Sequence, residues 1–204
     1  MSVLLAIDTA APRLQLALLH DGDRVDTLIE GMATGQAERL FPALDELLAR
    51  AGIAYADLTC IAVTTGPGSF TGLRIGLSAA RGLALALNIP VLGIPSLLAL
   101  SLAAHRGAIA VLLDARRDEA YFQTFSGPGM AISQPALLPL DEAHGLVPMG
   151  AETITSPFVD IAALARFAAT ADPKLYPPEA SYIRGADAKP QEKFRVAKVP
   201  EPAP

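Results

Sequence analysis

The sequence has few of the residues from which metal sites, disulfides and aromatic stacking platforms are built. Its 204 residues include one cysteine, three histidines and no tryptophan. One cysteine excludes an internal disulfide framework, and the scattered His20, His105 and His144 lack the spacing of a zinc site. We therefore expect no intrinsic metal, no Trp-based stacking of bases and a reduced, cytoplasmic setting.

Charge is also sparse, and its balance is acidic. Charged residues make up 18% of the chain, and 16 Lys and Arg against 21 Asp and Glu give a net charge of −5. This is the wrong sign for a protein that grips a phosphate backbone unaided. Hydrophobic residues reach 51%, which is far from the composition of a disordered chain. The composition therefore predicts a folded protein that does not bind nucleic acid by itself.

One long stretch, residues 82–104, carries no charge and has the length of a membrane span. Asn88, Pro90 and Pro95 interrupt it, so we expect a helix end, a short strand and a new helix instead. The opening MSVLLAIDTAAP lacks the basic start of a secretory leader. We expect neither a membrane segment nor a leader.

Hydrophobic spacing divides the first half of the chain into strands and helices. Short apolar runs separated by turn residues predict an antiparallel meander, and Leu40, Leu44 and Leu47 follow helical spacing. This order predicts an α/β unit. The expected elements are strands over 3–7, 14–19, 24–29, 60–65 and 91–94, helices over 36–51 and 73–87, and a glycine loop over 66–72.

A second, smaller unit begins near Ala108 in the same way as the first. In both units an apolar strand ends in an aspartate at a turn, Asp8 in the first and Asp114 in the second. The pattern indicates either a weak internal repeat or two hairpins that are alike by chance. The expected units are a first lobe over 1–105, a reduced second lobe over 106–183 with one helix near 158–169, and a solvated, extended tail over 184–204.

The most distinctive local feature is GPGSFTGLR, from Gly66 to Arg74. Between a buried strand and a helix, its amides and the helix dipole can hold an anion, although the glycine spacing fits neither a dinucleotide turn nor a Walker loop. Ser69 or Thr71 can cap the helix, so a purely structural turn is the alternative. Arg74 stands in the first turn, where a cation opposes the dipole, and this indicates pairing with an outside carboxylate or phosphate.

Two further features admit both a structural and a functional interpretation. Asp8 and Asp114 can hold a hydrated magnesium ion or position a polyphosphate, but aspartate is also an ordinary turn residue. The face of small residues in the second helix can admit a partner helix or pack on the chain's own sheet. This face consists of Gly72, Gly76, Ala79, Ala80 and Gly82.

Five segments together resemble a known family. They are LAIDT, ERLFPALDELLARAGI, DLTCIAVTTGPGSFTGLRIGLSAARGLALALNIPVLGIPSLLAL, DARRDEAYF and YIRGADAKP. They closely resemble TsaB, also called YeaZ, the dimerisation subunit of the bacterial machinery that makes threonylcarbamoyladenosine in tRNA. The resemblance covers residues 3 to about 125 and resumes at 182–190. It implies an α/β fold of the actin, Hsp70 and sugar-kinase type, with duplicated β-hairpin sheets in two lobes and a reduced second lobe.

The resemblance also implies a role. The TsaB family is related to TsaD, the catalytic subunit, which transfers a threonylcarbamoyl group to the adenosine beside the anticodon. TsaD holds its metal with a histidine pair on its first long helix, whereas the matching helix here offers Gln36, Glu38 and Arg39. The resemblance therefore implies a non-catalytic scaffold that binds TsaD, with no catalytic residues and no metal of its own.

Partners and binding residues follow from the same resemblance. The expected partners are TsaD, the ATPase TsaE, tRNA only indirectly through the complex, and a second copy when the chain is isolated. ATP or ADP with Mg²⁺ is expected only within the complex, at a cleft formed by Asp8, Thr9, Gly66, Gly68, Ser69, Thr71 and Asp114. The two long helices are expected to form the interface, through Leu40, Leu44, Leu47, Gly72, Arg74, Gly76, Leu77, Ala80 and Leu83.

Two other functions stay open at this point. An ATP-binding kinase- or ATPase-like enzyme of the same fold is favoured by Asp8, Asp114 and the glycine loop, and tight nucleotide binding by the isolated chain would support it. A glycoprotease-type metallopeptidase, a label attached to this superfamily, needs a metal-ligand cluster that the sequence lacks.

Overall fold

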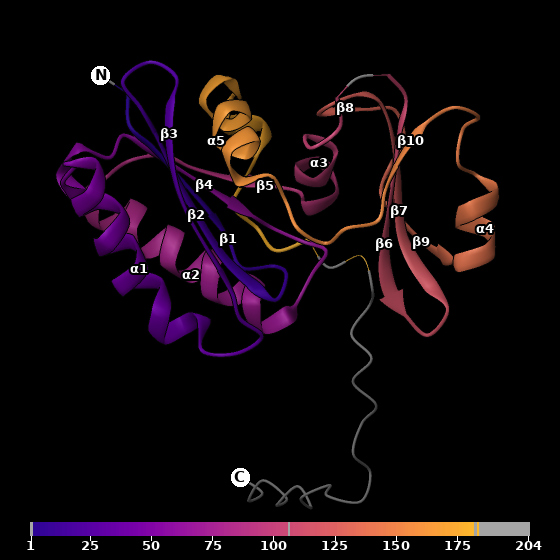
Figure 1. Cartoon of the computed structure of the whole chain (residues 1–204), viewed down its shortest axis with the longest axis horizontal. Coiled ribbons are helices and arrows are strands. Elements are labelled where there is room, and N and C mark those ends of the chain that lie inside the picture. The colour runs from indigo at the N-terminus through magenta and orange to yellow at the C-terminus, as the bar shows by residue number, and fades with distance from the viewer. Residues whose placement is uncertain (1, 106, 182, 184–204) are drawn as a thin grey trace, which may run out of the picture.

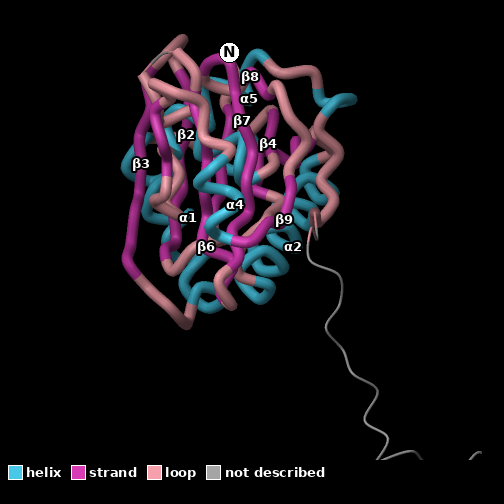
Figure 2. The backbone as a smooth tube through the Cα atoms, turned by 90° about the vertical axis from the view of Figure 1, so that its right-hand side faces the viewer, coloured by secondary structure: helices cyan, strands magenta, loops and turns pink. Residues whose placement is uncertain are grey.

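The computed structural model describes residues 2–105, 107–181 and 183 of the chain. These residues form two sheets, each with helices beside it (Figure 1). The first sheet has the strand order β3-β2-β1-β4-β5, and the second has the order β10-β6-β7-β8 with β9 paired to β7. Viewed from the second sheet (Figure 2), that sheet and α4 lie in front of the first sheet and its helices. This is the two-sheet α/β architecture that the sequence predicts.

The first sheet combines the expected meander with two parallel crossovers. β1 pairs antiparallel with β2 and parallel with β4, and β5 extends the parallel part. α2 begins at Phe70 rather than at residue 73, because the Ser69 hydroxyl accepts a hydrogen bond from the Gly72 amide (3.2 Å) and caps the helix. The elements are β1 (Leu4–Asp8), β2 (Arg13–His20), β3 (Arg24–Gly31), α1 (Gln36–Ala51), the 3₁₀ turn η1 (Tyr55–Asp57), β4 (Cys60–Thr64), α2 (Phe70–Leu87), β5 (Val91–Ile94) and α3 (Ser96–Ser101).

Strands β1, β2 and β4 of the first sheet are buried on both faces, which explains why they are nearly continuous apolar runs, whereas the edge strand β3 is partly exposed and carries polar residues. Successive side chains of β1 point to opposite faces. Leu5 and Ile7 pack with α1 and α2 on one face. Leu4 and Ala6 pack with α5 (Ile161–Thr170) on the other. Removing both faces from water is the main stabilising contribution to this lobe.

The second sheet is smaller, and its first strand begins where the second unit was expected. α5 leaves this unit and packs on β1 and β2 of the first sheet. The expected lobe over 106–183 therefore needs correction, because its last helix covers the otherwise open face of the first sheet. The remaining elements are β6 (Ile109–Arg116), β7 (Glu119–Gly127), β8 (Met130–Ala131), β9 (Ala136–Pro139), α4 (Leu140–Gly145), β10 (Glu152–Ile154) and the 3₁₀ turn η2 (Pro173–Leu175).

After η2 the chain returns to the edge of the first sheet. The Gly93 amide donates to the Tyr176 carbonyl (2.9 Å), and the Ser181 amide donates to the Thr65 carbonyl (2.8 Å). Gly93 has to be small here, because a Cβ would lie 2.4 Å from the Pro177 carbonyl oxygen. The expected extended tail over 184–204 lies outside the described residues.

The uncharged stretch 82–104 folds as the end of α2, β5 and α3, as the sequence predicts. Within the described part of the chain, α2 is the one helix with the length and hydropathy to cross a membrane. Leu73, Leu77 and Ala80 of this helix are buried, and Leu77 and Ala80 pack in the same core cluster as strands β1 and β4. One side of α2 is therefore a core helix face.

The β1–β2 turn and the start of α2 approach each other so closely that only glycine fits. A Cβ on Gly72 would lie 1.9 Å from the Thr9 carbonyl oxygen, and a Cβ on Gly68 would lie 2.7 Å from that of Ala10. Two hydrogen bonds hold the approach: the Thr9 hydroxyl donates to the Gly72 carbonyl (2.7 Å), and the Ser69 amide donates to the Ala10 carbonyl (2.7 Å). The turn and the helix thus form one rigid unit.

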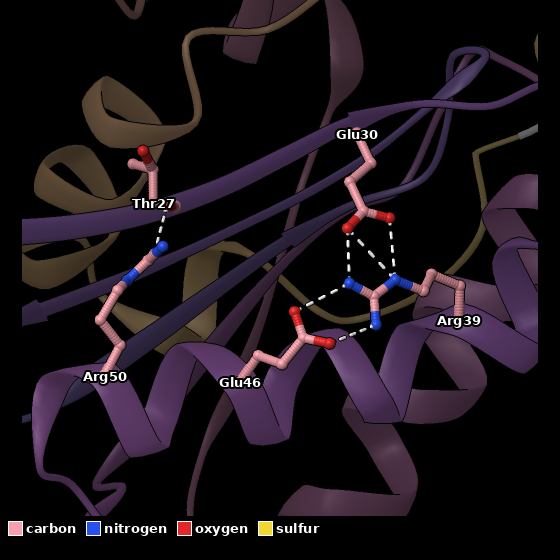
Figure 3. A network of polar contacts seen from close by, with 5 residues as sticks. All are labelled: Thr27, Glu30, Arg39, Glu46 and Arg50. Carbon is pink, nitrogen blue, oxygen red and sulfur yellow. Dashed lines mark hydrogen bonds and ion pairs between the residues drawn. The ribbon is translucent and has the colours of Figure 1, made fainter.

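A charged network ties α1 to the edge strand β3 (Figure 3). Arg39 donates from Nε (2.9 Å) and Nη2 (2.5 Å) to the Glu30 carboxylate, and from Nη1 (2.7 Å) and Nη2 (2.9 Å) to Glu46. Arg50 donates to the Thr27 carbonyl (2.6 Å). Hydrogen bonding from Arg39, reinforced by its charge, lowers the pKa of both Glu30 and Glu46.

The close approach at Gly72 predicts a position-specific effect of one added methyl group. Gly72→Ala is expected to lower the free energy of unfolding by about 2 kcal/mol or more, because the Thr9 backbone cannot move aside. Gly82→Ala is the matched control, since nothing lies within 4 Å of its Cβ position, and better helix propensity should stabilise it by up to about 1 kcal/mol. Urea unfolding measures both, and equal effects of the two changes would contradict the packing argument.

The Arg39 network predicts a stability difference that depends on pH. Both carboxyl groups have a lower pKa in the folded chain, so their contribution is present at neutral pH and is lost as the pH falls through the carboxyl range. Arg39→Ala should therefore lower the melting temperature at about pH 7 and change it little near about pH 3. Thermal unfolding followed by circular dichroism measures the difference. Arg50→Ala, whose guanidinium donates to a carbonyl, should show much weaker pH dependence; a constant Arg39 effect would argue against the network.

Candidate functional site

A cleft of about 770 Å³ separates the two sheets. The β1–β2 turn, the glycine loop, the start of α3 and the β6–β7 turn line it, so both lobes contribute. Its polar lining includes Asp8, Ser69, Ser96, Asp114, Arg116 and Tyr121. This places the two aspartates on one cleft, as the sequence analysis predicts.

Asp8 lies at the floor of the cleft and is fully buried. Its carboxylate accepts hydrogen bonds from the Thr64 hydroxyl (2.6 Å), the Gln15 side-chain amide (3.0 Å) and the Ala10 backbone amide (3.1 Å). Burial raises the pKa of Asp8, and these three donors act in the opposite direction. Both carboxylate oxygens are therefore engaged by the chain itself.

Asp114 repeats the local geometry of Asp8 in a solvent-exposed setting. Its carboxylate accepts from the Arg116 amide (2.6 Å), two residues ahead, just as Asp8 accepts from Ala10 two residues ahead. Both aspartates lie near the turn of an antiparallel hairpin: Asp8 ends β1, and Asp114 stands at the register shift two residues before the end of β6. The shared geometry supports the internal repeat over chance similarity.

The glycine loop uses most of its polar groups within the chain. The Gly66 amide donates to the Ser96 hydroxyl (3.1 Å), the Ser69 amide to the Ala10 carbonyl (2.7 Å), and the Gly72 amide to the Ser69 hydroxyl (3.2 Å). The space left by its glycines is filled by the β1–β2 turn. The loop is therefore built as a structural turn, with Ser69 as the cap.

The structure brings only some of the expected nucleotide residues together. Four of them, Asp8, Gly68, Ser69 and Asp114, line the cleft. Thr9 is buried and donates to α2, and Thr71 faces a different cavity. Nucleotide binding stays a prediction, and its site would be smaller than the sequence indicates. Within the described residues, no group of three or more His, Cys, Asp or Glu side chains could hold a metal ion.

The second cavity is a groove of about 770 Å³ between α1 and α2. Phe41 and Phe70 line it and are 44% and 53% exposed, and Leu85, farther along α2, is 85% exposed. The guanidinium carbon of Arg74 lies 3.8 Å from the centre of the Phe70 ring. Large apolar side chains thus surround a hollow on the outer side of the two helices.

The expected interface residues need correction. Leu40 lies at the floor of the groove, Arg74 is exposed and Leu83 is half-buried at the rim. The others are buried in the chain's own core, because the small-residue face is the face that approaches the sheet. The buried members are Leu44, Leu47, Gly72, Gly76, Leu77 and Ala80.

Sequence reasoning missed the residues that the helices do present. Phe41, Phe70, Ile75 and Ser78 line the groove, and none was singled out. The signal was available in Phe41 and Phe70, two large aromatic residues that fall outside the buried helical stripe. The prediction that the two helices form an interface stays a prediction, now with different side chains.

Comparison with known proteins gives one family and several relatives. The family model described as TsaD, tRNA N6-adenosine threonylcarbamoyltransferase, matches residues 31–155. The tRNA threonylcarbamoyladenosine biosynthesis protein TsaB of Escherichia coli (strain K12) is 37% identical over 126 residues, which cover 60% of this chain and 54% of that protein. The protein of the same name from Bacillus subtilis (strain 168) is 38% identical over 120 residues, which cover 58% and 52%. The chain spans about half the length of the curated relatives it matches.

A solved structure resembles this chain over almost its whole length. It is described as an uncharacterized protein from Pseudomonas aeruginosa with similarity to peptidase YeaZ, and it is 28% identical, with a TM-score of 0.77 over 90% of this chain and 100% of that one. This likeness confirms the expected α/β fold with two sheets. Since the family model also covers more than half of the sequence, the chain belongs to the TsaD family, and to its TsaB (YeaZ) members.

Proposed function

We propose that this chain is a non-catalytic scaffold that binds TsaD and supports threonylcarbamoyl transfer to the adenosine beside the anticodon of tRNA. Relatives named TsaB are described as tRNA threonylcarbamoyladenosine biosynthesis proteins, and the matching family model is that of the transferase. The observation that carries the proposal is the exposed apolar groove between α1 and α2.

The groove has the composition of a protein interface. Large exposed apolar side chains that gather in one place mark interaction sites, and aromatic residues are the usual anchors of such sites. Phe41, Phe70 and Leu85 provide three such side chains on adjacent helices. In the proposed complex TsaD covers this surface, and in the isolated chain a second copy covers it.

The partners supply the chemistry in this proposal. The Asp8 oxygens and the amides of Gly66, Ser69 and Gly72 are hydrogen-bonded to the chain's own groups, which supports a scaffold role. ATP or ADP with Mg²⁺ would then be held only within the complex, where TsaE is the ATPase. A net charge of −5 supports indirect contact with tRNA in the cytoplasm.

Reconstitution tests the scaffold role directly. TsaD, TsaE, tRNA and the threonylcarbamoyl-adenylate supply are combined with and without this chain, and modified adenosine is counted by mass spectrometry of digested tRNA. Modification is expected only when the chain is present, and the chain with tRNA and the adenylate alone should give none. Full modification without the chain would refute the proposal, and modification by the chain alone would make it the enzyme.

Substitutions at Phe41 in the groove and at Leu85, farther along α2, test where TsaD binds. Phe41→Ser and Leu85→Glu are expected to weaken TsaD binding by about 30-fold or more each, the size of an interface hot spot. Because both side chains are exposed, the melting temperature should change little. Ile132→Glu, at a 64% exposed position beyond β8 in the second lobe, is the matched control. Calorimetry with TsaD measures the three affinities, and equal losses would place the interface elsewhere.

A further inference from the structure

Arg74 is a cation with no partner of opposite charge inside the described part of the chain. Its guanidinium lies over the Phe70 ring, and none of the ion pairs or hydrogen bonds among the described residues includes it. Other arginines of this chain do have polar partners: Arg39 pairs with Glu30, and Arg166 with Asp23. Arg74 therefore differs from these two arginines and resembles Arg13, whose guanidinium carbon lies 3.5 Å from the centre of the Phe158 ring.

The structure moves Arg74 out of the first helical turn. Because α2 begins at Phe70, Arg74 is its fifth residue and lies in the second turn, not in the first turn as the sequence predicts. The effect of the helix dipole falls off within the first turn, so it does not decide the role of this cation. The stacking on Phe70 orients the guanidinium while leaving its N–H groups available, because a cation–π contact uses the face of the group rather than its donors.

The surroundings of Arg74 are apolar. Arg74 is the one charged side chain among the described residues that line the groove between α1 and α2. The rest of the lining is aliphatic, aromatic or small and uncharged: Ala37, Leu40, Phe41, Phe70, Ile75 and Leu83 are its larger part. A partner that fills this groove would remove Arg74 from water, and an unpaired buried charge is strongly unfavourable.

We propose that Arg74 is the polar anchor of the groove, and that it pairs with an Asp or Glu carboxylate flanked by apolar side chains on the docking segment of TsaD. The planar guanidinium suits two parallel hydrogen bonds to one carboxylate. Burial of the groove then strengthens this pair, while a neutral or basic segment would leave the charge unpaired. The inference rests on the proposed function, because it names the chemistry of the partner at that same site.

Affinity measurements with four variants test the anchor. TsaD from the same organism is titrated calorimetrically into the wild-type chain and into Arg74→Ala, Arg74→Gln, Arg74→Lys and Arg166→Ala. Arg166→Ala removes an equal charge from α5, on the opposite face of the first sheet. The Ala and Gln variants should bind about 30-fold more weakly or worse, Lys should lie in between because it keeps the charge without the fork, and Arg166→Ala should bind like wild type. Thermal unfolding confirms that each variant is folded.

The outcomes separate this inference from the proposed function. If all three Arg74 variants bind TsaD as tightly as the wild-type chain does, Arg74 is not the anchor. The proposed scaffold role is unaffected by that result. Equal weakening by Arg74→Ala and Arg166→Ala also overturns it, since general charge would then explain the effect. Loss of self-association with intact TsaD binding would make a second copy the occupant and the proposed partner wrong. No binding of TsaD by the wild-type chain refutes the proposed function, and the inference with it.

Identification of the partner carboxylate completes the test. Arg74→Glu is combined with TsaD variants in which single surface Asp or Glu residues are replaced by Lys. One such TsaD variant should bind Arg74→Glu at least tenfold more tightly than unmodified TsaD does. The same variant should bind the wild-type chain more weakly, as expected for a direct pair. Rescue by every replacement, or by none, would contradict a specific carboxylate partner.

Discussion

The close contact between the Thr9–Ala10 backbone and the start of α2 determines the shape of both cavities. Because Gly68 and Gly72 carry no Cβ, the turn after β1 fits against the helix and two hydrogen bonds hold it there. Ala10, Gly68 and Ser69 from this contact line the interlobe cleft. A motif that resembles an anion site from its sequence is thereby used for packing.

The same contact explains which side of each helix is left for a partner. α2 turns Gly72 and Gly76 toward the first sheet and its β1–β2 turn, and Phe70, Arg74 and Leu83 line the groove beside α1. Phe41 and Phe70 remain exposed, and Arg74 stands between an aromatic ring and an uncharged groove. A chain that is acidic overall thus presents an apolar surface with one cation. In the proposed complex, this surface contacts TsaD, while the partners supply the chemistry and the contact with RNA.

The two lobes are unequal because they bury different amounts of apolar surface. The first sheet is covered on both faces, by α1 and α2 on one side and α5 on the other. The second sheet is covered by shorter elements, including α4 with six residues. α5, which follows β10 in the chain, packs on the first sheet instead. Asp8 and Asp114 keep the common hairpin geometry, but one is buried and the other exposed. The two hairpins therefore share backbone geometry, but the surroundings of their aspartates differ.

Local sequence determined the elements, since apolar periodicity, turn residues and the Ser69 cap depend on neighbours along the chain. It also predicted the two similar hairpins, and the motifs in five segments indicated the family. The tertiary structure decided what periodicity cannot show: which side of an apolar helix faces its own sheet, and where α5 packs. Ala80 and Leu44 follow a helical stripe whether that stripe meets a sheet or a partner. The close approach of Gly72 to Thr9 in the fold assigns that stripe to the core and leaves Phe41, Phe70 and Arg74 on the surface.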